Sequence, residues 1–292
     1  MCRKSMAGVP KHPPLLSLAL LGAPYLCQPP ALGLGSGARS HGTGGPPKVT
    51  CPAMALLDRI ARPVRYGLEL AGAAWPQFAR PLILELASRR PIREILPGVH
   101  HWTAIHPRIR LPVDSYYLEE QRVVLDPMVP REGLEWFEQR ATPAQVVLTN
   151  RHHLRQSERF AKSFGCPIRC CNAGLHEFES GPEVEGFEFG DELAPGITAH
   201  ELGAICPDDT ALHIRTAKGS ALAFADGLTR PRGGGLSFVP GFLMGDDPAA
   251  VRAELRASLA QMLELDFDHL LFAHGEPLIA TGGRALRDFV RK

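Results

Sequence analysis

From residue 94 to the end of the chain, short apolar runs alternate with longer segments in which apolar residues recur every three or four positions. Apolar runs of four to seven residues are typical of buried strands, and the wider recurrence is typical of covering helices. We expect strands at 99–105, 113–119, 121–126, 146–149, 168–171, 197–200, 211–216, 220–225 and 269–273. We expect helices at 133–140, 157–164, 248–265 and 281–290. This alternation predicts one α/β domain over residues 94–292.

The N-terminal part of the chain has a different character. Residues 1–53 are rich in proline and glycine and contain no acidic residue, so they cannot bury enough surface to offset their chain entropy. We interpret them as a disordered leader or targeting segment, or as sequence upstream of a true start at Met54. Residues 54–93 show helical spacing broken by prolines and predict a helical arm. A basic amphipathic helix can lie on a membrane surface, but packing on the main domain is the preferred interpretation.

Charge and cysteine content restrict the partners and the compartment. The formal net charge of +1 argues against a nucleic-acid-binding surface. Seven cysteines without regular spacing do not form a disulfide pattern, which favours a cytoplasmic location. Organelle targeting or export is the alternative if residues 1–53 are a genuine leader. The expected partner is a small-molecule substrate rather than a nucleic acid or a membrane, and the sequence makes no prediction of oligomeric state.

Histidine and aspartate residues stand at the ends of four of the predicted strands. These residues are His152, His153, His200, Asp226 and His274. Strand ends hold side chains rigidly while leaving them open to a cleft. Imidazole and carboxylate groups are ligands for zinc, iron and manganese. The pattern therefore predicts a metal site or a catalytic site at these strand ends.

The order and spacing of these residues resemble the metallo-β-lactamase superfamily. That superfamily places an H-x-H-x-D-H motif after an apolar strand, then a lone histidine, a strand-terminal aspartate near glycine, and a final histidine before Gly-x-Pro. The corresponding segments here are 148–155 (LTNRHHLR), His200, 225–227 (ADG) and 273–277 (AHGEP). The resemblance covers residues 94–292. It implies an α/β fold that is a four-layer αβ/βα sandwich, with a metal cleft at one edge.

Compared residue by residue, the motif in this chain is degenerate. Asn150, Leu154 and Arg155 stand where the superfamily has its first histidine, its aspartate and its last histidine. Leucine cannot bind a metal, and Arg155 brings a permanent positive charge to the place of a ligand. The resemblance thus implies at most one divalent metal ion, with zinc preferred over iron or manganese, or no metal at all. The implied metal ligands are His152, His200, Asp226 and His274.

Two classes of function follow from these residues. The preferred one is a metal-dependent hydrolase that acts on a small ester, thioester, lactone or phosphoester through a metal-activated water. Asp226 or His153 would then act as the catalytic proton acceptor. The alternative is a non-catalytic relative that keeps the fold as a binding or structural module, because a fold does not determine a function.

We predict that a truncated chain starting at Met54 keeps the stability of the full chain, because residues 1–53 lack the periodicity of core-forming sequence. Urea unfolding should give free energies within about 0.5 kcal/mol of each other for the two chains. Loss of a cooperative transition in the truncated chain would contradict this prediction.

Overall fold

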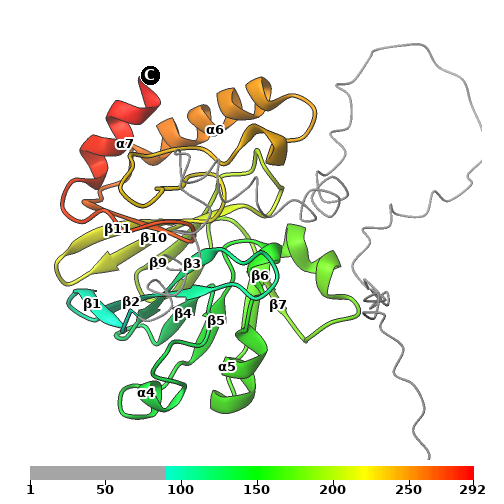
Figure 1. Cartoon of the computed structure of the whole chain (residues 1–292), viewed down its shortest axis with the longest axis vertical. Helices are drawn as coiled ribbons and strands as arrows, with labels where there is room; N and C mark the ends of the chain where they lie inside the picture. The colour runs from blue at the N-terminus through cyan, green and yellow to red at the C-terminus, as the bar shows by residue number, and fades with distance from the viewer. Residues whose placement is uncertain (1–89) are drawn as a thin grey trace, which may run out of the picture.

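The predicted apolar strands form the two inner layers of a sandwich (Figure 1). The structure, a computed structural model, describes residues 90–292. Within these residues the first sheet has seven strands, in the order β1 (Arg93–Leu96), β2 (Val99–Ile105), β3 (Pro112–Leu118), β4 (Val123–Leu125), β5 (Gln145–Val147), β6 (Ile168–Cys171) and β7 (Glu185–Phe187). The second sheet has five in the same part of the chain, in the order β12 (His269–Phe272), β11 (Gly219–Phe224), β10 (Thr210–Thr216), β9 (Ile197–Glu201) and β8 (Glu192–Ala194). Both sheets mix parallel and antiparallel pairs.

Helices form the two outer layers. Helices α4 (Glu135–Glu138) and α5 (Ser157–Phe164) lie on the first sheet, and α6 (Pro248–Met262) and α7 (Gly282–Val290) lie on the second (Figure 1). Short 3₁₀ turns occur at η1 (Arg151–His153), η2 (Asn172–Phe178) and η3 (Gly241–Leu243). The Asp247 carboxylate caps the first N–H groups of α6, and Gly165 ends α5 in the left-handed conformation that glycine tolerates best. Among these described helices, none is long and apolar enough to cross a membrane.

Three groups of buried apolar side chains fill the three spaces between these four layers. Val147 and Leu271 belong to the group between the sheets. Val146, the neighbour of Val147, belongs instead to the group between the first sheet and its helices. Leu255 of α6 packs with Phe272 in the group that lies over the second sheet. The side chains of adjacent strand residues thus lie on opposite faces of the sheet, as a period of two requires. The expected four-layer αβ/βα sandwich is confirmed.

The element predictions hold where the apolar pattern was strong. The thirteen predicted strands and helices are all present, with ends shifted by a few residues. Three strands were missed, namely β1, β7 and β8. All three lie at sheet edges, where exposed positions replace the apolar run that marks a central strand. The predicted leader and nearly all of the predicted helical arm lie outside the described residues.

The two sheets are joined directly where β3 meets β12. The Asp114 N–H donates to the Ala273 carbonyl at 2.9 Å. This donor is available because β4 is shorter than β3 and pairs with it only from Tyr116 onward. The Tyr116 hydroxyl donates to the Phe272 carbonyl and accepts from the Phe272 N–H, both at 3.0 Å. These bonds hold the ends of strands from both sheets together.

We predict that Tyr116→Phe lowers the free energy of unfolding by about 1–3 kcal/mol, because it leaves the buried Phe272 N–H without its partner. Tyr117→Phe is the matched control, since the Tyr117 hydroxyl binds only the Ala141 carbonyl in a loop. Its cost should stay within about 0.5–1.5 kcal/mol. Urea unfolding measures both variants, and a larger cost for Tyr117→Phe would show that the β3–β12 join matters little.

Candidate metal centre

Three side chains from the ends of three strands converge at one point. His153 lies in η1 after β5, Asp226 follows β11, and His274 follows β12. The His274 Nε2 lies 3.1 Å from Asp226 Oδ1 and 3.3 Å from His153 Nε2. His153 Nε2 lies 3.6 Å from the same Asp226 oxygen. One potential ligand atom from each residue lies within 4.8 Å of the other two, so the three groups could hold a metal ion.

The orientation of His153 is fixed by Asp126, the residue that follows β4. Asp126 Oδ2 lies 2.9 Å from His153 Nδ1. The other carboxylate oxygen accepts the Thr149 N–H at 2.8 Å, and the Thr149 hydroxyl donates to Oδ2 at 2.5 Å. A proton held on Nδ1 by this carboxylate leaves Nε2 facing Asp226 and His274, which is the arrangement that metal-binding histidines use.

Asp226 is held by groups that leave one of its oxygens for the cluster. The Asn150 side-chain amide donates to Asp226 Oδ2 at 2.9 Å, so Oδ1 faces the two histidines. The Asp226 N–H donates to Asp209 Oδ1 at 3.3 Å. Burial alone would raise the pKa of Asp226, but His153 and His274 hold it well below the usual range. Asp226 therefore carries a full negative charge at the centre.

The two histidines of the cluster differ in their proton affinity. Burial opposes a charge on His153, but Asp126 and Asp226 outweigh it and raise its pKa to about 9. Burial lowers the pKa of His274 below its ordinary value, although Asp226 acts in the opposite direction. Without a metal, His153 thus carries a second ring proton, at Nε2, in addition to the one at Nδ1. A bound cation would replace the Nε2 proton.

Arg155 lies half-buried beside this cluster. Its guanidinium donates to the carbonyls of Asp114 and Asp126 at 2.7 Å and to that of Ala273 at 3.3 Å. Both Arg155 (φ 46°) and Asp126 (φ 45°) adopt the left-handed backbone conformation that side chains rarely take. Two strained residues beside the cluster are typical of a functional site.

The structure brings together only part of the predicted ligand set. Asp226 and His274 are in the cluster with His153, which the sequence analysis assigned as a proton acceptor. His152 lies outside it, because successive residues of a 3₁₀ turn point about 120° apart. Burial and the neighbouring Arg151 lower the pKa of His152 to about 4.

His200 also lies outside the cluster. It is directly opposite Ala211 in the β9–β10 pair and so shares the sheet face that α6 and α7 cover. Ala199, its neighbour, faces the other sheet. The His200 ring lies 6.3 Å from the ring of His213. Strand alternation thus directs His200 away from the space between the sheets.

Sequence reasoning missed two residues of the site. Asp126 ends the apolar run 123–125 in the same way as Asp226 ends its own strand, so the signal was present. His106 directly follows the predicted strand 99–105, so it carried the same signal. Burial and the charges of Arg155, His153 and His274 lower the pKa of His106 to about 4, which places a neutral imidazole near the cluster.

Comparisons with known proteins identify the fold. No protein-family model and no curated protein sequence matches this chain. The structure matches a B3 metallo-β-lactamase with an active-site glutamic acid at a TM-score of 0.51 and 13% identity, covering 73% of this chain and 91% of that chain. It matches VMB-1 at 0.51 and 13%, covering 68% and 95%, and a β-lactamase domain protein from Burkholderia ambifaria at 0.51 and 15%, covering 70% and 74%. The chain therefore has the metallo-β-lactamase fold.

We predict that Asp126→Asn lowers the pKa of His153 from about 9 toward or below 6.5 in chelator-treated protein, because the carboxylate that holds its proton is lost. A histidine whose pKa is raised by folding stabilises the protein fully below pH 6.5, and this stability is lost as the pH rises through about 9. The variant should lose that part of the pH dependence. NMR titration of the His153 ring measures the change, with Asp247→Asn at the start of α6 as the control. An unchanged titration in Asp126→Asn would refute the role of Asp126.

Proposed function

We propose that this chain is a metal-dependent hydrolase that acts on a small ester, thioester, lactone or phosphoester. The observation that supports this is the convergence of His153, Asp226 and His274 from strands of both sheets. A divalent metal ion bound there supplies Lewis-acid activation of water and of the substrate's carbonyl or phosphoryl group. Three ligands leave room for water and substrate.

Each residue of the proposed centre has a defined task. His153 offers Nε2 because Asp126 holds its Nδ1 proton. Asp226 offers Oδ1 because Asn150 occupies its other oxygen. His274 offers Nε2 from the loop after β12. His153, first predicted as a proton acceptor, is here proposed as a ligand. Asp226, first predicted as both ligand and proton acceptor, keeps the ligand role alone, since a metal would occupy the same lone pairs.

We further propose that the centre holds one metal ion, with zinc preferred. Arg155 lies half-buried next to the cluster and already compensates the charges of Asp126, Asp114 and Asp226. A second dication beside this fixed cation would be electrostatically unfavourable. Two imidazoles and one carboxylate also suit Fe(II), so iron is the alternative metal, with manganese after it.

A cytoplasmic location is part of the same proposal. The four described cysteines, Cys166, Cys170, Cys171 and Cys206, are buried free thiols. Free thiols are typical of proteins in a reducing compartment.

We predict that the purified protein retains up to one equivalent of zinc after dialysis, measured by elemental analysis. His153→Ala, Asp226→Ala and His274→Ala should each lower zinc affinity at least tenfold, because each removes one of three ligands. His200→Ala and His152→Ala are the matched controls, and both should retain wild-type affinity because their side chains lie outside the cluster.

Loss of zinc in His200→Ala together with retention in His153→Ala would support the ligand set predicted from the sequence instead. Two retained equivalents in the unmodified protein would contradict the single-metal proposal. Absence of binding for zinc, iron and manganese would favour a non-catalytic binding module on the same fold.

A further inference from the structure

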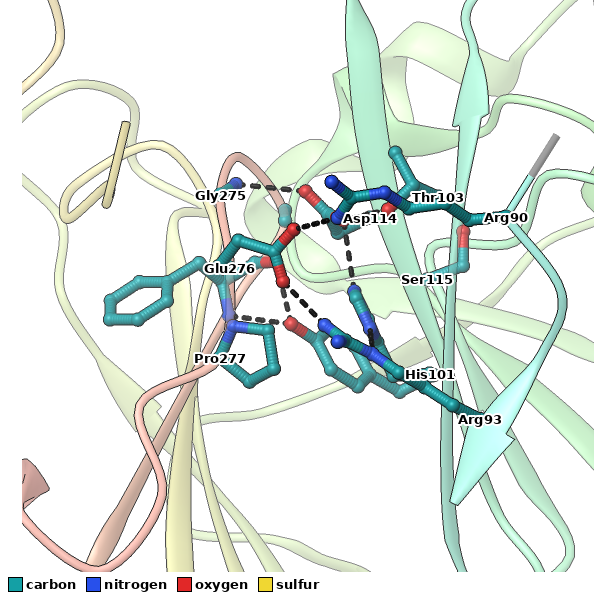
Figure 2. Close-up of polar contacts among 12 residues, drawn as sticks. Arg90, Arg93, His101, Thr103, Asp114, Ser115, Gly275, Glu276 and Pro277 are labelled. Carbon is teal, nitrogen blue, oxygen red and sulfur yellow. Dashed lines mark hydrogen bonds and ion pairs between the residues drawn. The ribbon is translucent and has the colours of Figure 1, made fainter. Parts of the chain in front are cut away.

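One carboxylate near the metal centre is held by three arginines. Glu276, two residues after His274, binds Arg90 through Oε1 at 2.6 Å. Arg232 binds the same oxygen, and Arg93 binds Oε2. Figure 2 shows Arg90 and Arg93 extending from the N-terminal side of the first sheet toward Glu276, which lies in the loop after β12. We call Arg90, Arg93 and Arg232 the arginine cluster.

The arginine cluster carries more positive charge than its partners neutralise. Its only other carboxylate partner among the described residues is Asp114, which accepts from Arg232 at 3.2 Å. Three guanidinium groups thus face two carboxylates. Asp114 is fully buried and is also bound by His101, Thr103 and the Gly275 N–H. Its negative charge is therefore shared with these interior partners. Within residues 90–292, the arginine cluster thus has one positive charge more than its carboxylate partners.

A hollow lies against two of these arginines, Arg90 and Arg93. Its volume is about 240 Å³, and it is lined by Arg90, Pro91, Arg93, His101, Trp102 and Thr103. The side chains of Arg90 and Arg93 are 52% and 48% exposed, so solvent reaches the guanidinium groups. Arginine binds carboxylate and phosphate groups with two parallel hydrogen bonds, and Glu276 already occupies the position of such a group.

Glu276, which binds the two arginines that line the hollow, lies close in the chain to the metal centre. His274 and Glu276 are separated by one residue, so their Cα atoms are at most about 7 Å apart. The intervening Gly275 donates to Asp114, whose carbonyl accepts from Arg155 beside the cluster. The carboxylate that the arginine cluster binds and His274 of the centre thus belong to one stretch of backbone.

We propose that the arginine cluster is an anion subsite that binds a carboxylate or phosphate group of the substrate, with Glu276 as the resident group that this anion displaces. The substrate is then an anionic ester, thioester, lactone or phosphoester whose charged group lies a few atoms from the bond that is cleaved. The identity of the substrate rests on the proposed hydrolase function, whereas the binding of an anion does not.

The test measures the affinity of chelator-treated full-length protein for inorganic phosphate and for acetate, by NMR titration at constant ionic strength. Glu276→Gln should bind either anion about three- to tenfold more tightly, because the competing carboxylate is gone. Arg93→Gln and Arg232→Gln should bind about three- to tenfold more weakly. Arg215→Gln removes an exposed arginine paired with Glu192 elsewhere on the surface and should change nothing.

The opposite signs separate a binding site from a structural ion-pair network. A network that only joins the sheets would show no tighter binding in Glu276→Gln, and that result would overturn the proposal. Anion binding that appears only after zinc is added would also overturn it, because the anion would then lie at the metal centre. If phosphate or acetate binds as expected but zinc does not, the anion subsite stands and the hydrolase proposal fails.

A second measurement tests the substrate class. A nitrophenyl ester with a free carboxylate should be hydrolysed with a higher kcat/KM than neutral nitrophenyl acetate. Arg93→Gln should reduce this preference about three- to tenfold, whereas Arg215→Gln should leave it unchanged. An equal loss for both esters would contradict the anion subsite.

Discussion

Arg155 binds the carbonyls of Asp114, Asp126 and Ala273 at once, and so connects the ends of β3, β4 and β12. A half-buried guanidinium is costly unless it is hydrogen-bonded, so separating these strand ends would cost the three hydrogen bonds that Arg155 makes. The direct bonds between β3 and β12 act in the same place. Hydrogen bonds between the two sheets therefore join the edge that carries the candidate centre.

The charges around this edge form a connected set. The Asp126 carbonyl accepts a hydrogen bond from Arg155, and the Asp126 carboxylate binds His153. Likewise, the Asp114 carbonyl accepts from Arg155, and the Asp114 carboxylate pairs with Arg232 of the arginine cluster. The buried carboxylates of Asp126 and Asp114 thus each have more than one cationic or hydrogen-bonding partner. Carboxylates are tolerated in a protein interior under this condition. The metal centre and the proposed anion subsite are two ends of one polar network.

The sequence was informative where burial imposed a pattern on it and uninformative where it did not. The central strands and the long helix α6 could be predicted because their buried faces require periodic apolar residues. The edge strands β1, β7 and β8 could not, since exposed positions interrupt their apolar pattern, whereas the buried edge strand β12 could. In the site, strand ends identified Asp226 and His274, but the choice between His152 and His153 depends on the rotation of a single 3₁₀ turn. Strand register places His200 on the sheet face that α6 and α7 cover, and the spacing of residues along the chain does not reveal register.

The three residues of the centre enter from the loops after β5, β11 and β12, which are far apart in the chain. No single loop or short segment contains all three, so a cation at this centre would recognise only a chain whose two sheets have already assembled. Its binding free energy would then add to the stability of the whole sandwich rather than to that of a local segment. The fraction of chains with a bound cation would accordingly follow the fraction that is fully folded. A substitution that destabilises a distant layer would lower the apparent affinity for the cation without altering any ligand.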